Sequence, residues 1–283
     1  MDINETEVVC EVAKTATKEV YGDLLKPSVR TTGEILNFIP RTLKTLCSRW
    51  DIWLYQKEQN VKAVCAAIDE KMKAIPESQQ VEPAPYIAIP ALQNMSYCVD
   101  NDELREMYAN LLANSMCDFS KKLAHPAYVE ILKQLSPDEA KIIRYLYKDC
   151  IRGLVPAIDV VYEKERDPYK LYSPYCTVLH KFTTITEDAK CECVELGDVY
   201  LDNILRLGFV NHENAKLEHD ELYEKLKSHQ VVKYFLSNIP QNYINCGYVH
   251  AKPLYSFYKL TPFGEAFCKA CLDEPNVNST RKN

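Results

Sequence analysis

The sequence predicts a mainly helical protein, with an N-terminal helical bundle followed by an α+β domain that has a few short strands. Apolar residues recur at helical spacing over most of the first half of the 283-residue chain. Only 7 glycines occur, which disfavours a turn-rich all-β fold. After Gly153, tyrosines and β-branched residues become more frequent, as is typical of strands. We therefore predict a helical domain over 1–152, an α+β domain over 153–272 and a disordered tail over 273–283.

The first half is expected to begin with two helical segments. Residues 1–30 are predicted to form a helix that breaks near Pro27. Residues 34–75 are predicted to be mostly helical, with Pro40 starting a new helix or kinking this one. Apolar side chains of the second segment recur at spacings of three and four, and they are Ile35, Ile39, Leu43, Leu46, Trp50 and Trp53.

A proline-rich connector is predicted at about 76–90. It contains Pro76, Pro83, Pro85 and Pro90. Each proline disfavours helix for itself and for the residue before it. We therefore expect this segment to be stiff and extended.

Helices are predicted from about residue 91 to residue 152. Asp100 can cap a helix whose apolar stripe leaves Asn110 and Asn114 on the polar side. The stripe consists of Leu104, Met107, Tyr108, Leu111 and Leu112. Next, His125-Pro126 is expected to begin a second helix, because proline is tolerated in the first turn.

The sequence from Ser136 to Glu139 is the strongest local signal for a helix start. Ser136 is the predicted N-cap, Pro137 fits the first helical position, and Glu139 can reach back to close a capping box. Asp138 and Glu139 are assigned to this cap and to solvent. Three short amphipathic helices joined by tight turns must bury their apolar stripes against one another.

Several of these motifs, in this order, resemble the Abi-alpha family of bacterial proteins. They are Val20–Pro27, the linker Ile75–Pro85, Asp102–Met116 and His125–Ile143. The resemblance covers about the first half of the chain, as far as Leu146, and is not extended through the second half. It implies a role in phage defence by abortive infection, with no catalytic activity or cofactor attached to it.

The second half contains a pattern that resembles the end of a winged-helix domain. A helix from Glu195 to Leu207 ends at Gly208, and Phe209-Val210 then opens a strand. A helix is predicted over 218–236 and a strand over 255–260, and Thr261-Pro262 begins a last helix. In winged-helix domains, the helix before the two strands of the wing is the one that reads DNA.

The charge of that helix disfavours DNA binding. It carries Glu195, Asp198 and Asp202 against Arg206 alone, so it is poorly suited to phosphates. A winged helix used for packing or partner contact is the preferred interpretation. The nucleic-acid alternative requires Arg206, Lys252 and Lys259 to meet in space, and a net charge of −6 disfavours nucleic acid as a partner.

A basic segment in this acidic chain is a candidate surface for a partner or for a membrane. Its residues are Arg41, Lys44, Arg49, Trp50, Trp53 and Lys57. A basic amphipathic helix with tryptophan can lie on an anionic membrane or on the acidic surface of a protein. The alternative is a core-packing helix whose charges face water. A further hypothesis is that the protein acts on membranes through residues 34–57.

No metal site or catalytic site is expected. Cys246, His250, Cys268 and Cys271 are zinc-ligand types, but cysteines on an apolar helix face are typical of a packed core. His125 is interpreted as a capping or packing residue, because Glu130 lies five positions away and therefore off its helix face. No catalytic motif was found, so we expect a non-enzyme with no cofactor and no small-molecule substrate.

The expected setting is cytoplasmic. The N-terminus is polar and acidic, unlike a signal peptide, and no apolar run approaches the ~20 residues that span a bilayer. The 12 cysteines are scattered, so reduced thiols are expected. The sequence therefore predicts a phage-defence protein that acts by binding an unknown protein, a second copy of itself being one option, or through a surface contact.

Overall fold

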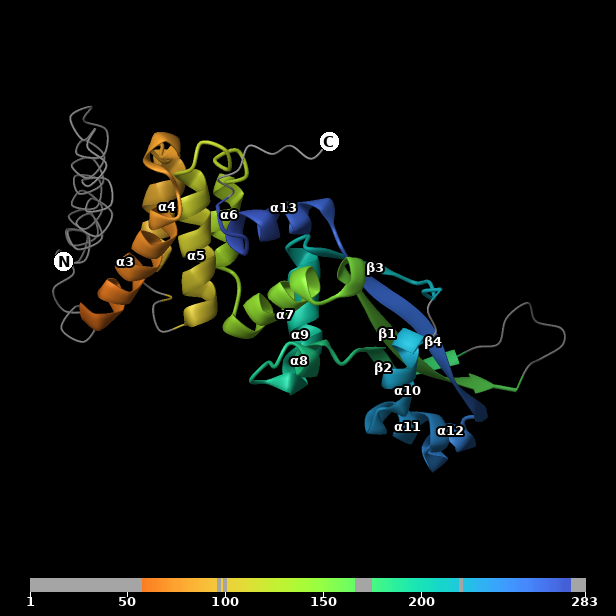
Figure 1. Ribbon diagram of the computed structural model, residues 1–283. Coiled ribbons are helices and arrows are strands. Elements are labelled where there is room, and N and C mark those ends of the chain that lie inside the picture. The colour runs from red at the N-terminus through yellow and green to blue at the C-terminus, as the bar shows by residue number, and fades with distance from the viewer. Residues whose placement is uncertain (1–57, 96–97, 99–100, 166–174, 219–220, 276–283) are drawn as a thin grey trace, which may run out of the picture. The chain divides into compact units, whose positions relative to one another are not determined.

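The computed structural model of the protein describes residues 58–95, 98, 101–165, 175–218 and 221–275 (Figure 1). These residues are mainly helical, with one four-stranded antiparallel sheet, which confirms the predicted mainly α class with some β structure. They form two compact units. The first contains the described residues up to Pro137 and those from Ala266 onward, and the second is Asp138–Glu265. The helices expected within residues 1–57 and the tail 276–283 lie outside the described residues.

Helix α5 is the central element of the first unit. The unit contains α3 (Glu58–Lys73), the short 3-10 helix η2 (Glu77–Gln79), α4 (Pro85–Met95), α5 (Asp102–Ser115), α6 (Pro126–Leu132) and the end of α13 (Pro262–Cys271). Helices α3, α4 and α6 all contact α5. The predicted apolar stripe of α5 is buried, at Leu104, Met107, Tyr108, Leu111 and Leu112.

The starts of α5 and α6 are set by local caps. The Oδ1 atom of Asn101 accepts the backbone N–H of Leu104 at 2.9 Å, so Asn101 is the cap of α5, rather than the predicted Asp100. Either side chain can cap a helix, and only the backbone geometry decides between neighbours. The Nδ1 atom of His125 accepts the N–H of Ala127 at 3.2 Å, which confirms its predicted capping role.

The proline-rich segment is less extended than the sequence predicted. Pro85 is the first residue of α4, and Pro90 lies inside that helix. A proline is accepted at a helix start because its missing N–H would have no partner there. The apolar residues around Pro90 are buried, and their packing outweighs its cost: Ile87, Ala88, Ile89, Ala91 and Leu92.

Two asparagines of α5 fasten the end of α13 to the first unit. Asn110 and Asn114, expected on the polar side of the helix, are buried. The Nδ2 atom of Asn110 donates to the carbonyl of Cys271 at 3.0 Å. The Nδ2 atom of Asn114 donates to the carbonyls of Ala270 and Asp273, at 3.0 and 3.1 Å. The carbonyls of Ala270 and Cys271 are among the last four of α13, which have no partner within the helix, and that of Asp273 follows just beyond its end.

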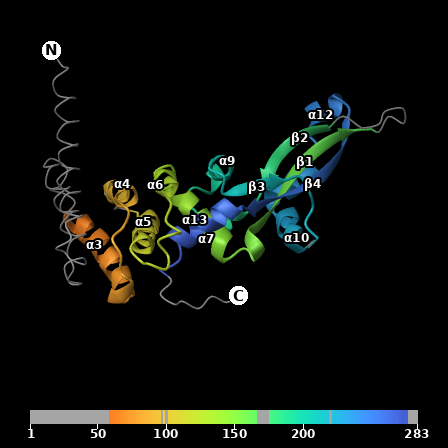
Figure 2. The same cartoon turned by 90° about the horizontal axis from the view of Figure 1, so that it is seen from above.

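The second unit is built on a sheet with strand order β2-β1-β4-β3. The strands are β1 (Leu154–Lys164), β2 (Tyr175–Phe182), β3 (Val210–Glu213) and β4 (Tyr248–Leu260). Every neighbouring pair is antiparallel, and β1 pairs with β4 from Leu154↔Lys259 to Lys164↔Tyr248. Figure 2 shows these two long strands side by side. The sequence predicted β3 and only the last part of β4.

Short helices between β3 and β4 cover one face of the sheet. They are α10 (Glu221–Ser228), α11 (Gln230–Ser237) and α12 (Gln241–Asn245). The single helix predicted over 218–236 is wrong, because His229 is a new N-cap whose Nδ1 accepts the N–H of Val231 at 3.3 Å. The buried core beneath them consists of Ile158, Val160, Tyr223, Leu226 and Val232.

The sequence from Thr261 to Gly264 joins the end of the sheet to α13. The Oγ1 atom of Thr261 accepts the N–H of Gly264 at 2.9 Å, which confirms the predicted cap. The same hydroxyl donates to the carbonyl of Gly208 at 2.6 Å. A Cβ atom at Gly264 would lie 2.5 Å from the backbone oxygen of Phe209, so this close approach requires glycine.

No helix among the described residues is both long enough and apolar enough to cross a membrane.

Candidate functional site

Helix α7 (Pro137–Lys148) begins with two buried carboxylates. Asp138 is 5 % exposed and Glu139 is 4 % exposed. Their predicted assignment to solvent is therefore wrong, although the helix does begin at Pro137 as expected. Buried carboxylates need hydrogen-bond partners, because desolvating an unpaired charge is costly. Apart from Lys141, on the same helix, the partners described below come from segments more than 50 residues further along the chain.

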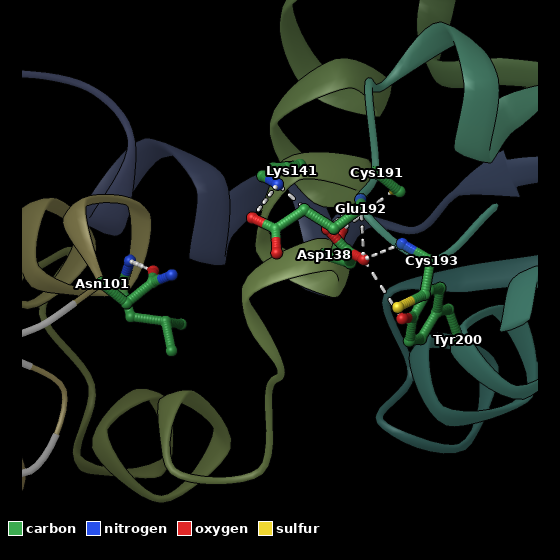
Figure 3. A network of polar contacts seen from close by, with 8 residues as sticks. Asn101, Asp138, Lys141, Cys191, Glu192, Cys193 and Tyr200 are labelled. Atoms are coloured by element: carbon green, nitrogen blue, oxygen red, sulfur yellow. Dashed lines mark hydrogen bonds and ion pairs between the residues drawn. The ribbon is translucent and has the colours of Figure 1, made fainter.

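Asp138 holds the segment that precedes α9 (Gly197–Arg206), as Figure 3 shows. Its carboxylate accepts the backbone N–H of Glu192 at 2.9 and 3.0 Å and that of Cys193 at 3.0 Å. It also accepts the hydroxyl of Tyr200 at 3.2 Å and the ammonium of Lys141 at 3.0 Å. Five donor contacts therefore converge on one side chain.

These contacts stabilise the ionised form of Asp138. Burial by itself would raise the pKa of this carboxyl, but the backbone N–H groups of Cys193 and Glu192 and the Lys141 ammonium lower the pKa to about 2. The hydrogen bond to Asp138 in turn raises the pKa of Lys141 above its ordinary value. The pair is consequently ionised at neutral pH and fixes the chain at residues 192–193.

Glu139 holds α9 itself. Its Oε1 atom accepts the Nδ2–H of Asn203 at 2.7 Å. The inner face of α9 also carries the buried residues Tyr200, Leu201 and Ile204. Polar and apolar contacts therefore fix the same face of the helix, and the opposite face is directed to solvent.

The outer surface of α9 combines exposed apolar and acidic side chains. Val199 is 61 % exposed, and Val194 and Leu196, in the turn just before the helix, are 41 % and 42 % exposed. Glu195, Asp198 and Asp202 are also exposed. We call this set the α9 face: Val194, Glu195, Leu196, Asp198, Val199 and Asp202. It is a candidate binding surface, and the sequence suggested only its acidic part.

The proposed nucleic-acid residues Arg206, Lys252 and Lys259 are all exposed. The Nε and Nη2 atoms of Arg206 donate to the Oδ1 of Asn203 at 3.1 and 2.6 Å. The ammonium of Lys252 lies 2.6 Å from Glu163. Both lysines are on β4, an odd number of residues apart, so they point to opposite faces of the sheet at a separation of roughly 23 Å. The structure therefore does not bring these two lysines together.

The basic candidate surface falls on residues that the structure does not describe. Arg41, Lys44, Arg49, Trp50, Trp53 and Lys57 all lie outside the described residues. The assignment of this segment to a partner or membrane surface stays a prediction.

The four residues considered as zinc ligands are divided between the two units. Cys268 and Cys271 are buried in the first, and Cys246 and His250 are exposed in the second. Among the described residues, no group of three or more His, Cys, Asp or Glu side chains is placed to hold a metal ion. Burial raises the pKa of the Cys150 thiol to about 12 and that of Cys191 to about 11, so neither is a ready nucleophile at neutral pH.

The sequence model of the abortive infection alpha family matches residues 56–271. The chain belongs to this family. The match extends beyond the first half of the chain and includes the whole of the second unit. The α9 face therefore lies within the part of the chain that the abortive infection alpha family shares.

The other comparisons add little to the family assignment. An uncharacterized protein of the marine bacterium Alcanivorax borkumensis SK2 has a solved structure that is 13 % identical, with a TM-score of 0.30. The similarity covers 55 % of this chain and 96 % of that protein. No curated protein sequence is significantly similar to the chain.

Proposed function

We propose that the protein acts in abortive infection, the response in which an infected bacterium stops phage propagation, and that it does so by binding another protein. Membership of the abortive infection alpha family supports the biological role. The α9 face carries the proposed mode of action, because several exposed apolar side chains within one short segment are typical of protein contacts. Catalysis is not part of the proposal.

We also propose that the second unit is a winged-helix domain with an insertion. Its elements follow the order α7, β1, α8 (Ile185–Asp188), α9, β3 and β4. Strand β4 pairs with both β1 and β3, as the three strands of a winged helix do. The additional strand β2 lengthens the sheet, and α10 to α12 occupy the position of the wing loop. In this interpretation α9 is the recognition helix.

A protein partner fits this recognition helix better than nucleic acid does. Binding to DNA depends on neutralising phosphates with lysine and arginine. Asp198 and Asp202 are exposed on α9, and Arg206, at its last residue, is bonded to Asn203. A negative surface repels a phosphate backbone, whereas it attracts a basic protein surface.

A phage challenge tests the proposal. Bacteria that express the wild-type chain are infected and scored for phage yield and for survival of infected cells. The comparison strain carries Leu111→Asp and Leu112→Asp, which places two charges in the buried core of the first unit and should unfold it. Lower phage yield with death of infected cells, lost in this variant, supports the proposal. An equal phage yield in both strains, over a panel of phages, contradicts it.

A further inference from the structure

We propose that the α9 face binds a basic, amphipathic segment of a partner protein. The inference rests on the proposed function and names the chemistry of the partner. It follows from three properties of this surface: clustered apolar exposure, unbalanced negative charge and rigid support from beneath.

The apolar exposure of the α9 face is concentrated. Val194, Leu196 and Val199 are all large apolar residues with more than a third of their surface exposed, and they lie within six consecutive positions. Single exposed apolar residues are ordinary on a protein surface, but a contiguous group indicates a contact. The partner must therefore supply apolar side chains.

The acidic residues are interspersed with this apolar group along the chain. Asp198 and Asp202 are one helical turn apart, and Val199 lies beside them on the same exposed face. Glu195 precedes Val199 by four positions and lies in the turn that leads into α9. From Val194 to Leu205 the chain contains no lysine or arginine. The negative charge of this surface is therefore not balanced by its own segment.

Two cations of this region, Lys141 and Arg206, already have anionic or polar partners. The ammonium of Lys141 lies 3.0 Å from Asp138 and 3.3 Å from Glu192. The guanidinium of Arg206 is held by Asn203. A partner that presents lysine or arginine around apolar side chains would complement both the charge and the apolar character of the α9 face. Anionic membranes and nucleic acids would be repelled by the same charges.

The polar contacts beneath α9 prepare the surface for binding. Asp138 fixes the backbone at residues 192–193, and Glu139 binds Asn203 on the inner side of the helix. A rigid, preformed surface loses little conformational entropy when a partner binds. The buried network of α7 therefore supports α9 from within, and the exposed α9 face is the docking surface.

The test uses the full chain and two designed helical peptides that share leucine positions and differ only in their polar residues, lysine in one and glutamate in the other. Fluorescence anisotropy measures binding of each labelled peptide at low and at physiological salt. We expect the lysine peptide to bind and the glutamate peptide not to bind. Either Asp198→Lys with Asp202→Lys, or Val199→Ser alone, should weaken binding by about tenfold or more.

A charge-matched control separates a specific surface from general attraction. Glu218→Lys with Glu221→Lys makes the same change of net charge at exposed positions of the same unit. This control should bind like the wild type. Equal weakening by both pairs of substitutions, or no binding of the lysine peptide to the wild type, overturns the inference. Circular dichroism should show that every variant is folded.

Two further measurements complete the test. If sedimentation shows self-association that Val199→Ser abolishes, the occupant is a second copy of the chain and the proposed partner is wrong. Failure of the proposed function would appear separately, as a wild-type chain that leaves phage yield unchanged although it binds the peptide through α9. Full phage protection by the Asp198→Lys, Asp202→Lys variant would instead overturn the docking role alone.

Discussion

Replacement of Asp138 by asparagine should destabilise the second unit and change how its stability depends on pH. The substitution preserves the shape of the side chain but removes its charge. It also places an amide N–H₂ group where two backbone N–H groups and the Tyr200 hydroxyl need an acceptor. Loss of buried, charge-assisted hydrogen bonds typically costs about 2–4 kcal/mol.

The pKa of Asp138 gives a second, independent value for the contribution of this carboxylate to stability. Its value of about 2 lies below its ordinary 3.8, so the folded state binds the proton less tightly than the unfolded state does. The corresponding stabilisation, roughly 2.5 kcal/mol, is fully present above pH 3.8 and is lost as the pH falls toward 2. The difference between the wild type and Asp138→Asn should therefore shrink over this range.

The assay is urea denaturation followed by circular dichroism at neutral pH and at several values down to pH 2.5. Asp118→Asn is the matched control, because Asp118 also has a lysine three positions later, Lys121 at 2.6 Å, but is about half exposed. An exposed ion pair contributes less than about 1 kcal/mol. The reasoning is refuted if both variants lose the same stability at neutral pH, or if the loss in Asp138→Asn does not change with pH.

Three other substitutions test contacts within the individual units. Asn114→Ala should cost about 1–3 kcal/mol and speed amide hydrogen exchange at the end of α13, because the carbonyls of Ala270 and Asp273 lose this donor; unchanged exchange would show that these bonds do not hold the end of α13. Gly264→Ala should lower the melting temperature through a loss of about 1–3 kcal/mol, since the new methyl group meets the Phe209 oxygen; equal stability would show that the backbone yields freely. Tyr223→Phe should cost about 1 kcal/mol in chemical denaturation, because its hydroxyl donates to a carbonyl of β4 at 3.0 Å, and no loss would mean that this bond contributes nothing.

Local signals predicted α5 and α6 of the first unit well. The apolar spacing from Leu104 to Leu112 identified the buried side of α5, and His125-Pro126 identified the start of α6. Such features depend on residues within one or two turns of each other, so the sequence carries them directly. The same applies to Thr261, whose cap is formed by a residue three positions away.

Features that depend on distant partners were missed. Strands β1 and β2 were not assigned, because β1 is held by pairing with β4 about 100 residues later, and its buried residues do not alternate regularly with exposed ones. Asn110 and Asn114 look like solvent-facing residues in a helical pattern. Their burial depends on the carbonyls of α13, more than 150 residues away.

The sequence by itself determined the family, the mainly helical class, the helix caps at His125 and Thr261 and the negative charge of α9. Only the tertiary structure decided which face of α9 is exposed and what Asp138 and Glu139 do. A carboxylate at a helix start satisfies local rules equally well in solvent or in a buried network. Whether the carboxylate is buried or solvated depends on hydrogen-bond donors in residues 192–203, which only the folded chain brings close. No local sequence pattern predicts this contact.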